Sequence, residues 1–174
     1  MDMLTQRAIA IKMFLLDVDG VLTDGKLYFS NQGDELKAFN IQDGLGIKFL
    51  QRSGITVGIV TGKRSQLVAN RARDLGIDIV VQGREDKLTA IREIITNYNV
   101  SLNEVAYMGD DLPDLSAINA VGLGMTLANG VSDVKKAAHW ISQYHGGHGA
   151  VREACELILS AQGKWEHLLK DYRG

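Results

Sequence analysis

The sequence predicts an α/β fold, with a three-layer, Rossmann-like parallel sheet flanked by helices. Two observations lead to this class and to a single domain. Short apolar runs alternate with longer stretches in which apolar residues recur at helical spacing, as they do when parallel strands are joined by right-handed helical crossovers. No linker, repeat or low-complexity tract interrupts the 174 residues. We therefore expect one domain over residues 1–174.

Five apolar runs are the predicted strands. The first is almost continuously apolar and stops at Asp17, which is typical of a strand buried on both faces. Two further short apolar runs flank the polar stretch 31–34 and predict a β-hairpin that protrudes from the core. The predicted strands of the sheet span residues 11–16, 55–60, 77–81, 105–108 and 121–125, and the hairpin spans 27–39.

Helices are predicted where apolar residues repeat every three or four positions. Gly76 supplies a C-terminal stop for one of them, and Pro113 suits the first turn of a short helix. The main helices span residues 43–53, 64–75, 85–98, 131–138 and 149–159. For the tail from Gly163 onward three outcomes stay open: packing on another subunit, packing on its own chain, or disorder.

The composition narrows the class of protein. Nineteen Lys and Arg against 21 Asp and Glu give a net charge of −2, which does not indicate nucleic acid or an anionic membrane as a partner. Cys155 is the only cysteine, which suits a reducing compartment. The sequence has no apolar run of about 18 residues, the length that a transmembrane helix needs, and no signal-peptide pattern. We expect a cytoplasmic protein.

Carboxylates gather where two predicted strands end. Asp17 and Asp19 follow the first strand, and Asp110 and Asp111 follow the fourth. Side chains two residues apart on an extended chain point the same way, and parallel strands carry their ligands at their carboxyl ends. Crowded carboxylates raise one another's pKa values, and a divalent cation relieves their repulsion. All-oxygen ligation suits Mg²⁺. The alternative is that each Asp merely ends a strand or caps a helix.

Phosphate-binding groups occur at the same predicted edge. Thr61 and Gly62 follow the second strand and can offer a hydroxyl and a backbone N–H to phosphoryl oxygens. Lys87 lies near the start of the helix after the third strand, where its ammonium could reach the same crevice. The alternative for Lys87 is a solvated surface lysine.

These residues carry a family resemblance. In order along the chain, residues 17–23 (Asp-Val-Asp-Gly-Val-Leu-Thr), 60–62 (Val-Thr-Gly), Lys87 and 109–114 (Gly-Asp-Asp-Leu-Pro-Asp) resemble the four motifs of the haloacid dehalogenase-like phosphatases. A lone Asp-x-Asp would be a weak signal. Four motifs in family order, each at a strand end or a helix start, are a specific one.

The resemblance implies a role for each position. Asp17 would be the nucleophile that forms an aspartyl-phosphate, and Asp19 would be the general acid and base. Mg²⁺ would be held by Asp17, the backbone carbonyl of Asp19 and Asp110. Thr61 and Lys87 would stabilise the phosphoryl oxygens. The residues expected to orient the metal's waters and Lys87 are Asp111 and Asp114.

The spacing of the motifs leaves no room for a cap domain. The stretches from Asp17 to Thr61 and from Thr61 to Lys87 are filled by core elements and by the hairpin. A lone hairpin is marginal in water, and its apolar residues would be better buried against copies of itself. We expect a homo-oligomer, a tetramer, in which a neighbouring subunit closes each site. The alternative is a hairpin folded onto its own core. The apolar residues concerned are Leu27, Phe29, Leu36 and Phe39.

Three features narrow the resemblance. The capless layout, residues 62–65 (Gly-Lys-Arg-Ser) and residues 146–153 resemble the 3-deoxy-D-manno-octulosonate 8-phosphate phosphatases, which serve lipopolysaccharide precursor synthesis, and relatives acting on nine-carbon sialic-type sugar phosphates. The implied substrate carries a phosphate and a carboxylate. Lys63 and Arg64 are candidate contacts to its carboxylate or sugar, and Arg152 is expected near a neighbour's site. Arg64 favours the octulosonate branch.

Two other classes stay as alternatives. A signalling receiver domain also makes an aspartyl-phosphate from clustered Asp, Thr and Lys. Its acidic pair precedes the phosphorylated Asp, whereas Asp110 and Asp111 follow Thr61 and Lys87. Asp19 would also be unexplained in a receiver. The second alternative is an assembly module that keeps the fold without turnover. Phosphatase turnover with Mg²⁺ separates the three readings.

Overall fold

The computed structural model describes residues 2–173 and contains a six-stranded, all-parallel sheet in the order β5-β4-β1-β6-β7-β8. The predicted α/β class is confirmed. The two end positions of the predicted domain, 1 and 174, lie outside the described residues. The strands are β1 (Met13–Leu16), β4 (Thr56–Thr61), β5 (Ile79–Gln82), β6 (Val105–Met108), β7 (Leu123–Thr126) and β8 (Trp140–Ile141).

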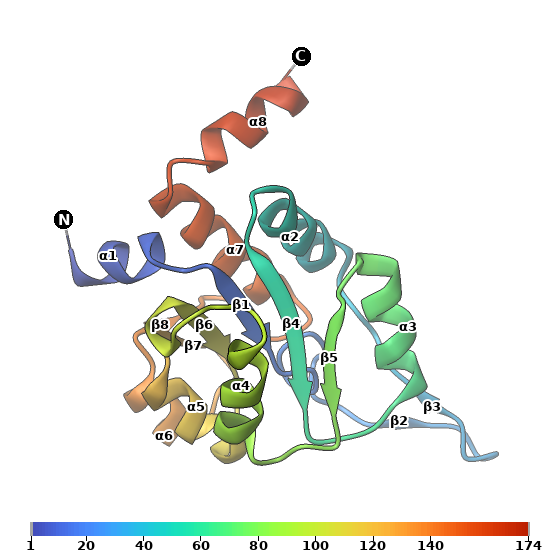
Figure 1. The fold of residues 1–174 in the computed structure, drawn as a ribbon. Helices are drawn as coiled ribbons and strands as arrows, with labels where there is room; N and C mark the ends of the chain where they lie inside the picture. Colours follow the sequence, from blue (N-terminus) through green and yellow to red (C-terminus); the bar gives the residue numbers. More distant parts are fainter. Residues whose placement is uncertain (1, 174) are drawn as a thin grey trace.

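Helices cover both faces of this sheet (Figure 1). None of the helices in residues 2–173 is both long and apolar enough to span a bilayer. One face carries α1 (Met3–Ile9), α2 (Ile41–Arg52), α3 (Gln66–Leu75) and α7 (Ala150–Ala161), and the other carries α4 (Lys87–Thr96), α5 (Leu115–Ala120) and α6 (Ser132–Ala137). The remaining elements are α8 (Trp165–Arg173) and the 3₁₀ turns η1 (Leu102–Glu104) and η2 (Leu112–Asp114).

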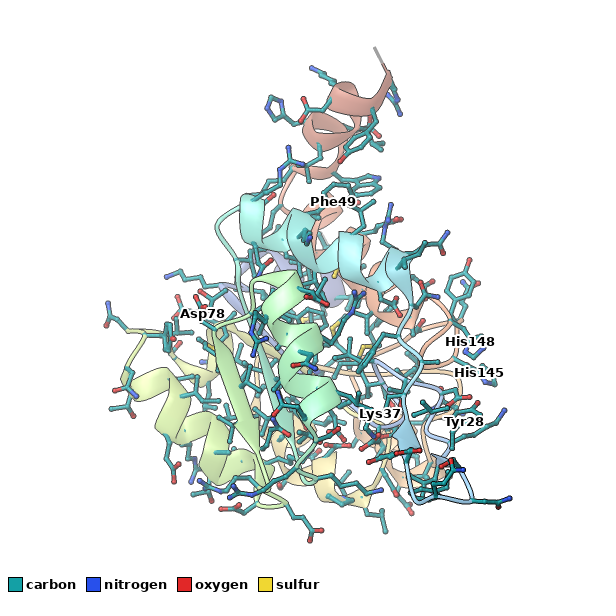
Figure 2. The ribbon with its side chains drawn as sticks, turned by 90° about the vertical axis from the view of Figure 1, so that its right-hand side faces the viewer. Tyr28, Lys37, Phe49, Asp78, His145 and His148 are labelled. Carbon is teal, nitrogen blue, oxygen red and sulfur yellow. The ribbon has the colours of Figure 1, made fainter. Side chains whose placement is uncertain are left out.

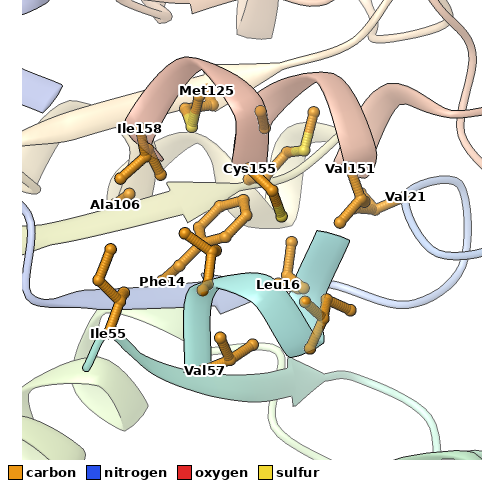
Figure 3. Packing of buried hydrophobic residues seen from close by; sticks show 14 of the residues in the cluster. Phe14, Leu16, Val21, Ile55, Val57, Ala106, Met125, Val151, Cys155 and Ile158 are labelled. Atoms are coloured by element: carbon orange, nitrogen blue, oxygen red, sulfur yellow. The ribbon is translucent and has the colours of Figure 1, made fainter. Parts of the chain in front are cut away.

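Alternate residues of the central strand serve the two cores. Phe14 and Leu16 pack in the cluster beneath α2 and α7, whereas Met13 and Leu15 pack in the cluster beneath α4 and α5. Figure 3 shows the first of these clusters, with Cys155 of α7 among its buried side chains. Successive side chains of a strand point to opposite faces, so a continuous apolar run is what a doubly covered strand requires.

The predicted hairpin forms and projects from the body. Its strands β2 (Tyr28–Phe29) and β3 (Glu35–Leu36) pair antiparallel. Figure 1 shows it leaving the molecule at the end towards which the arrows of β4 and β5 point. Leu36 and Phe29 are exposed, at 63% and 64% of their surface, while Phe39 packs against the core. Among the described residues the hairpin strands therefore remain largely uncovered.

Four elements were not predicted, and the short 3₁₀ turn η1 is one of them. Helix α1 buries only Ala8, so it lacks a strong apolar period. Strand β8 is two residues long and is only partly buried. The tail forms α8 and packs on its own chain, where Phe49 meets the rings of Trp165 and Tyr172 edge to face. Weak periodicity explains why the sequence pattern did not reveal α1, and short length explains it for β8, whereas α8 is amphipathic over nine residues and carries a helical period that the prediction left unassigned.

Candidate active site

A cleft of about 280 Å³ opens at the carboxyl ends of β1, β4 and β6. This is the edge at which ligands bind in parallel α/β sheets. The structure brings nearly all the predicted site residues to it, from segments far apart in the chain. The predicted residues that line the cleft are Asp17, Asp19, Thr61, Gly62, Lys63, Lys87, Asp110, Asp111 and Asp114, and Gly25, Glu85 and Pro113 complete the lining.

Asp17 lies directly after β1, and its position is held by backbone and side-chain contacts. Its backbone N–H donates to the carbonyl of Met108, at 3.0 Å. Its Oδ1 accepts the N–H of Val18 at 2.7 Å and lies 3.0 Å from the Lys87 ammonium. Burial and the charge of Asp114 raise the pKa of Asp17 to about 6, although Lys87 acts in the opposite direction.

Lys87 begins α4 and is almost completely buried, with 2% of its side chain exposed. Its Nζ donates to the carbonyl of Val60 at 3.0 Å and lies 3.0 Å from Asp17 and 3.2 Å from Asp114. A buried ammonium is tolerated only when it is paired and hydrogen-bonded. The reading of Lys87 as a solvated surface lysine is therefore wrong.

Asp114 organises the floor of the cleft. Its Oδ1 accepts the hydroxyl of Tyr107 at 2.5 Å and pairs with Lys87. Its Oδ2 accepts the backbone N–H groups of Asp110 and Asp111, at 3.0 and 3.2 Å. A carboxylate has about four lone-pair sites, and these four contacts occupy them. Asp114 is thus suited to hold its neighbours in place rather than to ligate a metal directly.

Tyr107 is a site residue that sequence reasoning missed. It lies in the middle of β6, is fully buried, and donates to Asp114. Burial, then the charges of Asp114 and Asp17, raise the pKa of its phenol well above the usual value, so the hydroxyl remains a donor. The signal in the sequence was a tyrosine inside an otherwise apolar buried strand, because such a hydroxyl needs a partner.

The donor set of the cleft fits a hard divalent cation. One carboxylate oxygen each from Asp17, Asp110 and Asp114 lies within 4.8 Å of the others. Burial, then the charges of Asp114, Asp17 and Asp111, raise the pKa of Asp110 to about 7. Carboxylates crowded in this way favour an oxygen-ligated ion such as Mg²⁺. With Asp114 engaged elsewhere, the side chains free to ligate are those of Asp17 and Asp110.

Gly20 allows the loop after β1 to approach Asp110. Its φ is +88°, in the left-handed region, and a Cβ there would lie 2.0 Å from Asp110 Oδ2. Any other residue would be strained and would displace the carboxylate. The glycine of the first motif is therefore required by the geometry of the fourth.

Asp19 pairs with a second lysine, which sequence reasoning also missed. Its Oδ1 lies 2.5 Å from Nζ of Lys37, which lies 3.1 Å from Glu35 as well. Burial alone would lower the pKa of the Lys37 ammonium, but the hydrogen bonds of Asp19 and Glu35 raise it above its ordinary value. Lys37 directly follows β3 in the chain. Because its pKa is raised, its ammonium is charged at neutral pH.

Comparisons with known proteins identify the family of this chain. The profile of the haloacid dehalogenase-like hydrolase family matches residues 77–153. The 3-deoxy-D-manno-octulosonate 8-phosphate phosphatase of Yersinia pestis is 46% identical over 165 residues, which cover 95% of this chain and 88% of that protein. The chain belongs to the haloacid dehalogenase-like hydrolases. Within them it is a phosphoric monoester hydrolase, similar to the octulosonate 8-phosphate phosphatases.

Two solved structures of such hydrolases have the same fold. The phosphatase of Moraxella catarrhalis, in complex with a magnesium ion, a phosphate ion and a KDO molecule, superposes with a TM-score of 0.97 at 43% identity and covers 99% of both chains. The cobalt-bound phosphatase of Haemophilus influenzae superposes with a TM-score of 0.89 at 40% identity, covering 92% of this chain and 94% of its own.

In this hydrolase the glycine cluster at residues 146–149 supports the first motif. The N–H of Gly146 donates to Oδ1 of Asn129 at 2.7 Å, and Nδ2 of Asn129 donates to the carbonyl of Gly20 at 3.0 Å. A Cβ on Gly146 would lie 1.9 Å from that same carbonyl. Asn129 was not predicted, because its two partners lie 17 and 109 positions away.

Two predicted substrate contacts lie outside the cleft of their own chain. Arg64 lines a shallow groove near Gln82. Arg152, on α7, pairs with Glu156 at 2.6 Å, and its guanidinium lies 5.4 Å from the ring centres of Phe49 and Trp165. The roles assigned to Arg64 and Arg152 stay predictions.

Proposed function

We propose that this hydrolase converts 3-deoxy-D-manno-octulosonate 8-phosphate to 3-deoxy-D-manno-octulosonate and phosphate, with Mg²⁺ as cofactor, in lipopolysaccharide precursor synthesis. The observation that carries the proposal is the triad of Asp17, Lys87 and Asp114, which holds a carboxylate beside a buried ammonium at the bottom of the cleft. The Moraxella catarrhalis relative, which contains magnesium, phosphate and KDO, supports the choice of cofactor and substrate.

The proposed reaction has two steps. The carboxylate of Asp17 attacks phosphorus, the bond to the sugar oxygen breaks, and Asp19 gives that oxygen a proton. Water then attacks the aspartyl-phosphate, Asp19 takes the proton of the water, and phosphate leaves while the Asp17 carboxylate is restored. Each step is easier than the direct displacement. Asp19 lines the cleft with Asp17, as these proton transfers require.

The chain's own groups would bind the phosphoryl oxygens. Thr61 and Gly62 follow β4 and line the cleft, and Lys87 places a fixed positive charge beside Asp17. Such preorganised donors stabilise charge that develops in the transition state. When bound, Mg²⁺ would be held by Asp17, Asp110 and the backbone carbonyl of Asp19, and would offset the repulsion between carboxylate and phosphate.

The sugar end of the substrate would meet Lys63 at the mouth of the cleft. We further propose that Arg64 contacts the carboxylate or sugar, and that Arg152 does so from a neighbouring subunit. A homotetramer, with each hairpin closing a neighbour's site, would cover the exposed side chains of the hairpin. One hydrolase domain over residues 1–174 and a cytoplasmic location complete the proposal.

The test is phosphate release from a panel of sugar phosphates that includes eight- and nine-carbon ulosonic acids. We expect the octulosonate 8-phosphate to give the highest kcat/KM, and preference for a nine-carbon substrate would move the enzyme to the sialic-type branch. Asp17→Asn should abolish release, by about 10⁴-fold or more, with an unchanged fold. The matched control is Asp78→Asn, an exposed Asp at the other end of the sheet (Figure 2).

Substantial turnover by Asp17→Asn would overturn the nucleophile assignment. Accumulation of a phosphorylated chain without release of phosphate would favour a phosphoacceptor module. A monomeric mass in solution together with full activity would overturn the closure of the site by a neighbouring subunit.

A further inference from the structure

A buried ammonium sits at the base of an exposed hairpin. Only 3% of the Lys37 side chain is exposed, although Leu36 beside it is 63% exposed. In Figure 2 Lys37 lies on the side of the hairpin that faces the body of the molecule. Burying an ammonium is costly unless it is paired, so its two carboxylate partners determine where it can lie.

One partner is the carboxylate of Asp19. Lys37 Nζ contacts Oδ1 of Asp19 at 2.5 Å. Within residues 2–173 no other hydrogen bond or ion pair restrains the Asp19 side chain. The lysine therefore holds one oxygen of the carboxylate and leaves the other available for proton transfer.

The other partner belongs to the hairpin. Glu35 precedes Lys37 by two positions, and side chains at that spacing point the same way on an extended chain. Its Oε1 lies 3.1 Å from Lys37 Nζ. Because Leu27, Tyr28, Phe29 and Leu36 are exposed, apolar burial on this chain's core does little to hold the hairpin strands. A charged contact thus links the hairpin to Asp19.

This inference rests on the proposed function, in which Asp19 is the acid and base. We propose that Lys37 is a positioning residue that orients the Asp19 carboxylate towards the leaving oxygen and couples proton transfer to the position of the hairpin. Its effect is exerted through Asp19. Loss of Lys37 would leave Asp17, Lys87 and Asp110 in place, because none of their described contacts involves it.

The choice of leaving group distinguishes an effect of Lys37 on the general acid Asp19 from an effect on phosphate or metal binding. A sugar alkoxide must be protonated as it leaves, whereas p-nitrophenolate leaves without a proton. Misplacing the general acid should therefore slow the first chemical step for a sugar phosphate and spare it for p-nitrophenyl phosphate. Loss of phosphate binding or of the metal would slow both substrates alike.

The experiment measures release of the leaving group, the sugar or p-nitrophenolate, in the first turnover of the Mg²⁺-loaded enzyme, before the aspartyl-phosphate is hydrolysed. We expect Lys37→Met to lower the rate of this turnover by about 30-fold with octulosonate 8-phosphate and by less than about threefold with p-nitrophenyl phosphate. The size of the first effect follows because general acid catalysis contributes ~10²–10⁴-fold. The loss should appear in the rate constant of this first turnover at saturating substrate, rather than in the substrate concentration that half-saturates the enzyme. Lys37→Arg, which keeps a positive charge, should recover part of the loss.

The matched control is Lys26→Met. Lys26 lies in the same segment and pairs with Asp24 at 3.7 Å, but 73% of its side chain is exposed. It should leave both rates unchanged. A readout independent of turnover is amide hydrogen exchange over residues 27–39, which should be faster in Lys37→Met and unchanged in Lys26→Met.

Three outcomes would overturn the inference. Equal loss on both substrates would make Lys37 a binding or structural residue. Unchanged rates in Lys37→Met would remove it from the mechanism. If the unaltered enzyme releases no phosphate from either substrate, the proposed function fails and the inference fails with it. Should Lys37→Met not fold, Glu35→Gln removes the second anchor, and it should show the same substrate difference at smaller size.

Discussion

The cleft and the hairpin lie at the same end of the molecule but differ in how their side chains are accommodated. In the cleft, Lys87 and Asp114 are buried and each is held by several partners within one chain. In the hairpin, Phe29 and Leu36 are apolar and exposed, and the buried charge of Lys37 supplies its link to the core. The residues at the edge of the parallel sheet thus pair their buried charges within one subunit, while the hairpin is left with unburied apolar surface.

This difference has an energetic origin. Lys87 and Asp114 are desolvated, so each must be paired or it would destabilise the fold. Exposed apolar side chains carry no comparable penalty, but they gain free energy when they are covered. Changes in the cleft should therefore alter stability and chemistry together, and changes in the hairpin should alter association with little effect on the subunit.

The largest effect is expected from removing Asp114. Asp114→Ala leaves the Tyr107 hydroxyl and two backbone N–H groups without their acceptor and removes one of the two carboxylate partners of Lys87. It should cost about 3 kcal/mol of unfolding free energy and most of the activity. Denaturant unfolding measures the first quantity. Asp111→Ala removes the cap that this side chain gives to the backbone N–H groups of Leu112 and Asp114 at the start of η2 and should cost about 1 kcal/mol. Equal costs would show that Asp114 is not the organiser of the floor.

The next effect is the pH dependence of stabilisation by Mg²⁺. The pKa values of Asp17 and Asp110 are raised to about 6 and about 7. Metal-free protein should therefore lose stability as pH rises from about 4 to 7, because the unfolded chain releases these protons first. Mg²⁺ needs the ionised forms, so its stabilisation should grow over the same range.

Melting temperature with and without Mg²⁺ checks this. At a concentration near 100 times Kd the ion should add about 2.7 kcal/mol, which corresponds to a shift of roughly 5 °C or more, at pH 8, and much less at pH 5. In Asp110→Asn the shift in melting temperature on addition of Mg²⁺ should be small at both pH 8 and pH 5. A shift independent of pH would contradict the assignment of these carboxylates as ligands.

A smaller effect is expected at Gly20. Gly20→Ala places a Cβ against Asp110 and should weaken Mg²⁺ binding by about tenfold, which calorimetric titration measures. The control is Gly33→Ala in the hairpin turn. Gly33 has a similar φ of +89°, but a Cβ there would meet no atom of the described chain within 4 Å. It should show the strain of the left-handed backbone and unchanged metal affinity.

The smallest effect on subunit stability is expected at the hairpin surface. Phe29→Ser with Leu36→Ser should change unfolding free energy by less than about 0.5 kcal/mol, since both residues are exposed. The particle mass should fall if the proposed tetramer buries them. Leu50→Ala, in the core of α2, is the contrasting control at about 3 kcal/mol. An unchanged mass would remove the hairpin from any subunit interface.

Local sequence patterns were sufficient to predict the strands of the sheet. They failed at the start of α2, where two nearby residues could each cap the helix. Helix α2 was predicted from residue 43, but it begins at Ile41 because the Asn40 side chain accepts the N–H groups of Gln42 and Asp43. The Asp43 carboxylate instead accepts the N–H of Arg152 in the first turn of α7, at 2.8 Å. An Asp near a helix start predicts a cap, but only the packing of two helices shows which helix it caps.

The sequence by itself determined the alternation of strands and helices, the identity of the acids at the strand ends and their order along the chain. These are local properties, set by periodicity and by spacing of a few residues. The tertiary structure alone decided that Tyr107 meets Asp114, that Lys37 meets Asp19 and that Asn129 braces Gly20. Side-chain hydrogen bonds act over about 3 Å, and no local pattern records which distant segments the fold brings within that reach.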